Sequence, residues 1–214
     1  DPQFRVETVS PAGEQALRHR YGLPRPFVMY TGGIDLRKNI EGLIRAYALV
    51  PSPLKAADQL AIVCSARPQD KQKLLDLARS LGLADGDVVV TGFVPDVELV
   101  ALYNLCHLFV FPSWHEGFGL PALEAMNCGA VVLGANTSSV PEVIGLDEAL
   151  FDPGQLGLQV GRLPLPRGRD AAREFALLPL QFAHCFRLQG VGERGPVSLF
   201  QARLSQPGPL GVGV

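Results

Sequence analysis

From residue 27 onward, short apolar runs alternate with segments in which apolar residues recur every three or four positions. The runs suit strands that are buried on both faces, and the segments between them suit amphipathic crossover helices. This alternation is typical of a parallel sheet with helices on both sides. The sequence therefore predicts an α/β fold, a doubly wound, Rossmann-like parallel sheet of about six strands.

The expected strands are the apolar runs themselves, at residues 27–31, 59–65, 88–91, 107–111, 130–134 and 149–151. Helices are expected after Asn39, from Pro68 to a C-terminal cap at Gly82, after Asp96, near Pro121 and around 141–144. Asn39 and Asp96 are the expected N-terminal caps, because short polar side chains can accept hydrogen bonds from the free N–H groups of a first turn.

Composition divides the chain into three parts. Residues 1–23 are expected to connect to something N-terminal and to contain a helix at 11–21, and residues 24–153 are the predicted α/β domain. Residues 154–214 hold seven Arg, no Lys and three acidic residues, with Gly and Pro throughout. This predicts an irregular, atypical tail, either disordered or translated out of frame; a genuine but unusual tail is the alternative.

Several classes of protein are disfavoured by composition. A net charge of −2 gives no basic field, so no nucleic-acid partner is expected. The four cysteines follow no zinc pattern and suit buried thiols in a reducing compartment. No apolar run approaches the roughly 18 residues that span a bilayer, and no signal region is apparent. These features predict a cytoplasmic protein.

The loop from Pro112 to Glu124 is the first candidate site, because ligands of open parallel sheets bind beyond the carboxyl ends of strands. Gly117 and Gly119 allow a turn that brings backbone N–H groups to a ligand, and the following helix N-terminus favours a pyrophosphate. Glu116 in the loop and Glu124 in the first helical turn could face one pocket, gripping a sugar hydroxyl and a ribose diol. The alternative is a solvated Glu116 and a Glu124 that only complements the helix dipole.

Two further loops offer weaker signals. Arg37 and Lys38 precede a helix and could neutralise a diphosphate leaving group, although a solvated basic pair is the common alternative. Phe93 and Val94 could form apolar walls for a nucleobase, or only plug a turn. The sequence Asp85-Gly-Asp87 is interpreted as a turn rather than a metal site, and no metal site is predicted.

Taken together, these motifs make residues 24–153 resemble the C-terminal domain of the GT-B retaining glycosyltransferases of family four, which include sucrose synthases and bacterial mannosyltransferases. The resemblance rests on motifs in a fixed order: Tyr30–Gly33 with Arg37–Asn39, Thr91–Val94, Phe111–Ser113, Glu116–Glu124 and Ser138–Glu142. Glutamates separated by seven residues are fairly specific in this setting.

The resemblance implies one half of a GT-B fold, which binds the donor while a hexose moves from a UDP- or GDP-sugar with retention. It implies no cofactor and no metal. Glu116 would contact the donor sugar, Arg37 and Lys38 would hold the diphosphate, and Glu124 would bind the ribose. The remaining donor-binding residues would be Gly33, Phe93, Val94, Gly117, Phe118, Gly119 and Leu120.

This chain departs from the family pattern. Ile34 stands where members often carry Arg, and the N-terminal domain that receives the saccharide or lipid-linked acceptor is missing. The chain alone is therefore expected to be inactive, and a peripheral membrane association of the full enzyme stays open. The alternatives are a non-catalytic nucleotide-sugar-binding module, a degenerate fragment, or a GT-B epimerase, which the Glu116–Glu124 string argues against.

Overall fold

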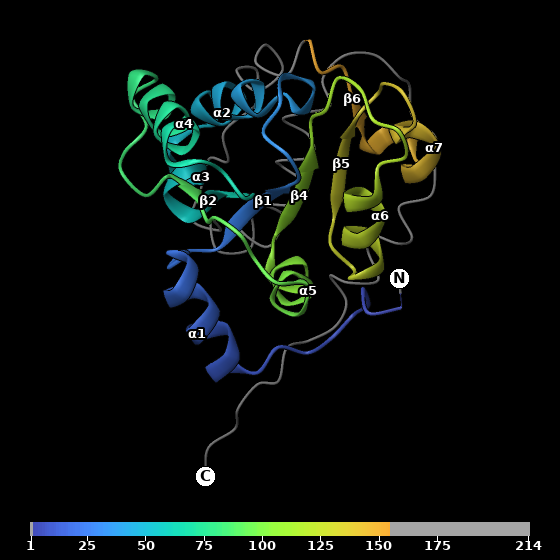
Figure 1. Ribbon diagram of the computed structural model, residues 1–214, viewed down its shortest axis with the longest axis horizontal. Helices are drawn as coiled ribbons and strands as arrows, with labels where there is room; N and C mark the ends of the chain where they lie inside the picture. Colours follow the sequence, from blue (N-terminus) through green and yellow to red (C-terminus); the bar gives the residue numbers. More distant parts are fainter. Residues whose placement is uncertain (1, 155–214) are drawn as a thin grey trace, which may run out of the picture.

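A computed structural model describes residues 2–154 (Figure 1), so all of the predicted tail except Gly154 lies outside the described residues. Six strands form one parallel sheet in the order β3-β2-β1-β4-β5-β6, which confirms the predicted fold class. The strands are β1 (Phe27–Thr31), β2 (Gln59–Val63), β3 (Val88–Val90), β4 (Leu108–Phe111), β5 (Val132–Ala135) and β6 (Leu150–Phe151).

The helices divide into two groups by their contacts. One group joins α2 (Ile40–Ala48) to α4 (Pro68–Ser80), with the short α3 (Ser52–Ala57) between them in the sequence. In the other group α1 packs on α5, α5 on α6 and α6 on α7, as Figure 1 shows. These helices are α1 (Pro11–Tyr21), α5 (Asp96–Leu105), α6 (Leu120–Asn127) and α7 (Val140–Ile144). Short 3-10 turns lie at η1 (Leu36–Lys38) and η2 (Asp147–Ala149).

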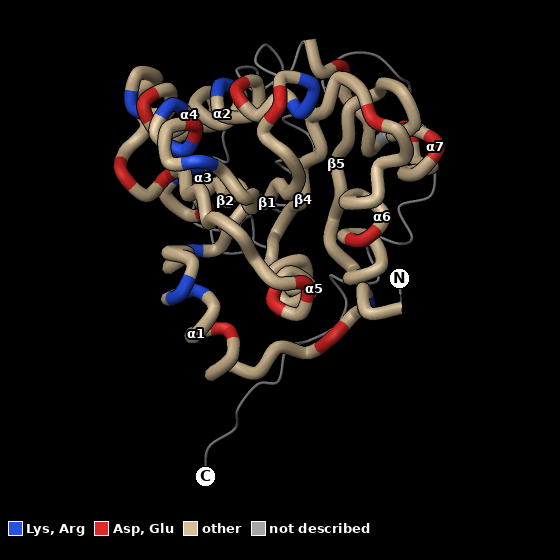
Figure 2. Tube along the Cα trace, viewed as in Figure 1, with Lys and Arg blue, Asp and Glu red and all other residues tan. Residues whose placement is uncertain are grey.

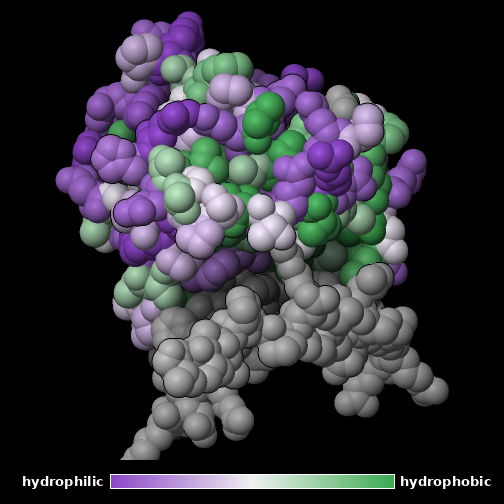
Figure 3. Space-filling model, turned by 90° about the horizontal axis from the view of Figure 1, so that it is seen from below, coloured by the Kyte–Doolittle hydropathy of each residue, from purple (hydrophilic) through white to green (hydrophobic). Residues whose placement is uncertain are grey.

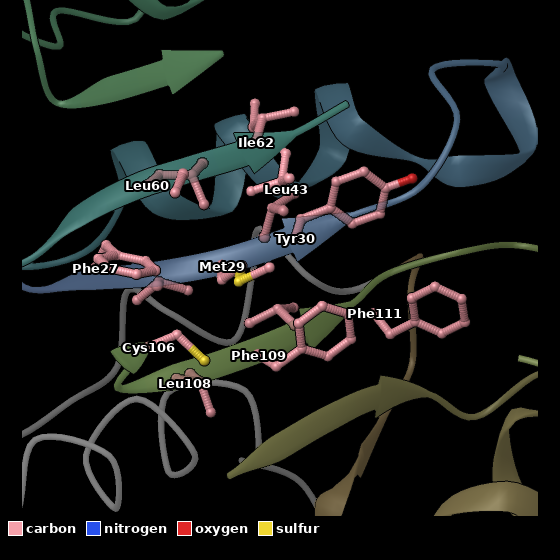
Figure 4. Packing of buried hydrophobic residues seen from close by; sticks show 14 of the residues in the cluster. Phe27, Met29, Tyr30, Leu43, Leu60, Ile62, Cys106, Leu108, Phe109 and Phe111 are labelled. Atoms are coloured by element: carbon pink, nitrogen blue, oxygen red, sulfur yellow. The ribbon is translucent and has the colours of Figure 1, made fainter. Parts of the chain in front are cut away.

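The core lies along the central strands. Every residue of β1, β2, β4 and β5 is buried, as expected when helices cover both faces of a parallel sheet. Phe27, Met29 and Phe109 are completely buried side chains of the paired strands β1 and β4, and the Tyr30 hydroxyl points toward the loop that follows β1 (Figure 4). The buried end of β1 is therefore in direct contact with the loop that follows it.

Neither of the two predicted N-terminal caps acts as expected, although both residues lie at the start of a helix. The side chain of Asn39 makes no capping hydrogen bond and instead donates to the carbonyl of Pro112. Pro95, not Asp96, is the N-cap of α5, and Asp96 is already helical. Helix α3 was not predicted, and β2 and β3 end earlier than expected, at Val63 and Val90.

The N-terminal segment packs against α5. Ser10 caps α1 as an acceptor for the N–H of Gly13, and Gly22 closes the helix with φ 67°. Phe4 is buried in the core although it precedes the first helix. Tyr21 and Arg20 both bond to the carboxylate of Glu98 on α5. The predicted connector is thus attached to the domain along its length.

Within residues 2–154, no helix is long and apolar enough to cross a membrane. Acidic and basic residues are interspersed over α1, α2 and α4 (Figure 2). On the face seen from below in Figure 3, apolar residues are interrupted by polar ones.

Gly134 of β5 lies close to the side chains of α7, and this approach generates a stability prediction. A Cβ atom at this position would lie 2.6 Å from Val140 Cγ1 and 2.3 Å from Ile144 Cδ1. Because overpacking forces neighbours out of their preferred rotamers, we expect Gly134→Ala to lower the free energy of unfolding by about 1–3 kcal/mol, measured by urea denaturation.

Gly117→Ala is the matched control, because a Cβ there meets nothing within 4 Å. We expect its free energy of unfolding to stay at the wild-type value. Equal stability of the two variants would contradict the tight approach of α7 to β5.

Candidate functional site

The site forms where β1 and β4 pair, the point at which the strand order reverses direction. The loops that leave the carboxyl ends of these two strands are residues 32–39 and 112–119, and they are bonded to each other. The Trp114 N–H donates to the Arg37 carbonyl at 2.7 Å, and Asn39 Nδ2 donates to the Pro112 carbonyl at 3.1 Å. Open α/β sheets bind their ligands beyond the carboxyl ends of the strands at such a reversal point, and we call this place between the two loops the crevice.

A lysine and a glutamate bridge the two loops. Lys38 Nζ lies 2.8 Å from Oε1 and 2.9 Å from Oε2 of Glu116. Both side chains are largely buried, with exposed fractions of 17% and 9%. The sequence predicted both residues as site residues but did not predict that they pair. A cation and a carboxylate held together in this way could separate around a ligand that carries both an anion and hydroxyl groups.

Arg37 lies beside this pair but faces solvent. Its guanidinium and its backbone N–H both donate to Asp35 Oδ1. These hydrogen bonds lower the pKa of the Asp35 carboxyl below its ordinary value, and the bond from the Arg37 side chain has the larger effect. An anion in the crevice would compete with Asp35 for this guanidinium.

Tyr30 contacts the turn at Gly32 and Gly33. The Tyr30 hydroxyl donates to the Gly33 carbonyl at 2.7 Å, and burial raises its pKa. Gly32 has φ 145°, and a Cβ there would lie 2.7 Å from the Tyr30 hydroxyl. Gly33 belongs to the predicted set, and the tyrosine that holds its carbonyl was not assigned a role.

The backbone of Glu116 is held by two serines from the loop between β5 and α7. Ser138 Oγ donates to the Glu116 carbonyl at 2.6 Å and lies 3.3 Å from the Glu116 N–H, from which it accepts. Ser139 Oγ donates to the same carbonyl at 3.2 Å. Sequence reasoning included both serines in a motif but gave them no function, because their partner is 22 or more positions away.

Gly117–Leu120 complete the loop before α6. Gly119 has φ 94° and is the N-cap of the helix, whereas Gly117 does not adopt a left-handed conformation. The predicted turn therefore depends on Gly119 alone. Phe118 and Leu120 each expose more than half of their surface. These two apolar side chains are open to a ligand or a partner.

Glu124 lies in the second turn of α6, not the predicted first turn, because the helix begins at Leu120. The Tyr103 hydroxyl of α5 donates to Glu124 Oε2 at 3.1 Å. Burial raises the pKa of this carboxyl, and the Tyr103 hydrogen bond opposes that rise. Glu116 and Glu124 thus have different protein partners, and their sharing of one ligand stays a prediction.

The third candidate loop separates its two predicted residues. Phe93 is 75% exposed, whereas Val94 is 8% exposed and belongs to the hydrophobic core. Among the described residues, only Phe93 of this pair has a side chain freely accessible to a nucleobase. Val94 could contribute through its backbone.

The Asp85-Gly-Asp87 sequence forms a turn, with Gly86 at φ 89°. Asp87 pairs with Arg25, and Asp85 pairs with Arg79. Across residues 2–154, no group of three or more His, Cys, Asp or Glu side chains is arranged to hold a metal ion. Both aspartates therefore have structural partners.

Comparison with known proteins identifies the family to which these residues are similar. Residues 15–158 match the family described as glycosyl transferases group 1. The chain is 48% identical over 151 residues to the serotype-specific mannosyltransferase WbdA of Escherichia coli, covering 71% of this chain and 18% of the relative. It is 36% identical over 168 residues to the O-antigen chain mannosyltransferase B of Escherichia coli, covering 78% and 44%.

A solved structure agrees with the fold. HepE from Anabaena, crystallised with UDP-glucose, superposes with a TM-score of 0.63 at 24% identity, covering 86% of this chain and 48% of that one. The chain thus spans less than half the length of these similar proteins.

The bridge between Lys38 and Glu116 generates a prediction for stability. Lys38→Met would leave the Glu116 carboxylate largely buried without its cation, so we expect the free energy of unfolding to fall by about 2–4 kcal/mol. The double variant Lys38→Met with Glu116→Gln should recover much of this loss, as a double-mutant cycle by chemical denaturation would measure.

Arg37→Met provides the control, because its ion pair with Asp35 is solvent-exposed and should contribute almost nothing. A Lys38→Met variant as stable as Arg37→Met would show that the bridge does not hold the two loops together.

Proposed function

Because this chain belongs to the glycosyl transferases group 1 family, we propose that it is the donor-binding half of a retaining hexosyltransferase. The donor is a UDP- or GDP-sugar, and the acceptor is a saccharide or a lipid-linked saccharide. The acceptor binds to a second domain, since the chain spans only 18% and 44% of the two mannosyltransferases to which it is similar.

The observation that supports the proposal most directly is the bridge from Lys38 to Glu116 at the β1–β4 crevice. A sugar diphosphate carries an anion and hydroxyl groups, which could replace the two partners of this bridge. The diphosphate would take the ammonium of Lys38, and a sugar hydroxyl would donate to the released carboxylate of Glu116. Both new contacts are charge-assisted, so they can offset the loss of the bridge.

Charge compensation at the leaving group is the main catalytic contribution in this scheme. As the bond from the anomeric carbon to the diphosphate breaks, negative charge grows on the diphosphate oxygens and positive charge on the sugar ring. Lys38, together with Arg37 once it leaves Asp35, would stabilise the diphosphate, and the carboxylate of Glu116 would face the sugar. We include metal independence in the proposal because these residues supply the positive charge.

The names of the two similar proteins indicate mannose as the transferred sugar. WbdA and the O-antigen chain mannosyltransferase B are both named as mannosyltransferases, at 48% and 36% identity. HepE, the structural neighbour, was crystallised with UDP-glucose. We therefore propose a mannosyl donor first and a glucosyl donor second, with the base to be decided by titration.

Calorimetric titration of the 214-residue chain with UDP, GDP, UDP-glucose and GDP-mannose tests donor binding. We expect one nucleotide to bind, and its sugar conjugate to bind at least as well. Absence of binding by all four would remove the donor-site assignment. Sugar transfer should require the chain extended upstream, and robust transfer by this chain alone would overturn the half-enzyme proposal.

Glu116→Gln in the upstream-extended protein separates catalysis from binding. Because the amide keeps the shape of the side chain but loses its charge, we expect kcat to fall by about 100-fold or more while the nucleotide Kd changes by only a few fold. Glu41→Gln, at an exposed position in the first turn of α2, is a charge-matched control and should leave both unchanged. An equal loss of kcat and of nucleotide affinity in Glu116→Gln would indicate a purely structural role.

The raised pKa of Glu124 generates a prediction for the pH dependence of binding. An ionised carboxylate accepts hydrogen bonds from ribose hydroxyls, so its contribution is present above its pKa and is lost as the pH falls through it. Because burial raises this pKa above the ordinary 4.5, we expect the loss to begin at higher pH than for a solvated glutamate.

The measurement is the ratio of nucleotide Kd in Glu124→Gln to that in the wild type, followed from neutral pH downward. The ratio cancels titration of the diphosphate itself. We expect it to shrink toward one in acid. A ratio that does not change with pH would mean that the charge of Glu124 plays no part in binding.

A further inference from the structure

We propose that Tyr103 is a positioning residue, which orients the carboxylate of Glu124 toward the ribose of the donor. This inference rests on the proposed function, because it takes Glu124 as the ribose-binding group. It adds a residue outside the crevice to the donor site, located on α5 rather than in any of the loops that follow the strands.

The geometry around Tyr103 is that of a fixed anchor. The side chain is completely buried, and its hydroxyl donates to Glu124 Oε2 at 3.1 Å. Two aromatic neighbours make edge-to-face contacts with its ring. Phe4 lies 6.0 Å away between ring centroids at 72°, and Phe109 of β4 lies 5.5 Å away at 65°. Edge-to-face contacts of this kind leave the tyrosine little freedom to rotate.

Glu124 needs such an anchor because a glutamate side chain has several rotatable bonds and Glu124 is only half-buried. Ordering its carboxylate when a ligand arrives would cost conformational entropy that the ligand must offset. The hydrogen bond from Tyr103 uses Oε2 and so orders the carboxylate beforehand, while Oε1 can accept from a ribose hydroxyl.

The same hydrogen bond also acts on the charge of Glu124. Burial and the nearby Asp96 raise the pKa of this carboxyl, whereas the Tyr103 hydroxyl lowers it. Loss of the hydroxyl would therefore favour the protonated form, which is a poorer acceptor for a diol. Orientation and ionisation both depend on a single phenol oxygen.

The N-terminal segment contributes to this anchor. Phe4 is held in place because Asn104, the residue after Tyr103, bonds with the backbone of two residues that follow Phe4. Its Nδ2 donates to the Arg5 carbonyl at 3.1 Å, and its Oδ1 accepts from the Glu7 N–H at 2.9 Å. A purely structural tyrosine would share this packing, so the test must measure ribose recognition rather than stability.

The test compares Tyr103→Phe with Tyr47→Phe in the 214-residue chain. Tyr47 is equally buried, and its hydroxyl also makes one hydrogen bond, to the Asp58 carbonyl at 2.7 Å just before β2, so it is a matched control outside the donor site. Calorimetry gives the Kd of GDP and 2′-deoxy-GDP, and of UDP and 2′-deoxy-UDP, for each protein. The ratio of deoxy to ribo Kd reports recognition of the ribose 2′-hydroxyl.

We expect Tyr103→Phe to weaken ribonucleotide binding by about three- to tenfold, the effect of one lost hydrogen bond, and to change deoxynucleotide binding much less. The ratio should therefore fall, and the acid loss of ribonucleotide affinity should move to higher pH. Tyr47→Phe should change neither. Should Tyr103→Phe fail to fold, Phe4→Leu loosens the ring without removing the hydroxyl and should lower the ratio to a smaller extent.

Glu124→Gln separates failure of this inference from failure of the proposed function. A ratio that collapses in Glu124→Gln but stays at the wild-type value in Tyr103→Phe, or in Phe4→Leu when that variant is used, overturns the positioning role and keeps the donor site. A wild-type ratio in Glu124→Gln itself would instead remove Glu124 from the ribose site, and the role of Tyr103 with it.

Discussion

β1 and β4 lie side by side at the centre of the sheet, although two other strands come between them in the sequence. Because crossover connections are right-handed, the helices reached from these two strands cover opposite faces of the sheet. The crevice left between the loops is crossed by Lys38 and Glu116, which are 78 positions apart. The site therefore depends on a strand pairing rather than on any one segment of chain.

Local chemistry explains why much of the fold could be predicted from the sequence. The strands were recognisable because residues such as those of β1 and β4 are almost all apolar, a pattern that needs no knowledge of partners. Helix α3 was missed because Pro51 and Pro53 flank its first residue and are typical of a loop. Asn39 and Asp96 were assigned as caps on residue type alone, and tertiary contacts gave Asn39 a different partner.

The candidate site was predictable in its residue types but not in its contacts. Glu116 and Lys38 could be identified from their loops, yet their pairing depends on the order of the strands. Tyr103 lies in an apolar helical pattern that resembles ordinary core, and only the three-dimensional structure places its hydroxyl on Glu124. Glu124 was expected in the first turn because the helix was expected to start near Pro121. The N-cap is Gly119, so α6 starts at Leu120 and Glu124 lies in the second turn.

Ser138 lies in the left-handed region of backbone space, with φ 55°, which is uncommon for any residue except glycine. Glycine would adopt this conformation without strain but has no oxygen to hold the carbonyl of Glu116. Threonine would keep the oxygen, but its branched Cβ would make the conformation still less favourable. The position thus has two opposing requirements, a left-handed backbone conformation and a hydroxyl group that bonds to Glu116. Serine is the smallest side chain that meets both. Sequence variation at this point should therefore be narrow, and a change to glycine would exchange a well-held Glu116 for a more mobile one.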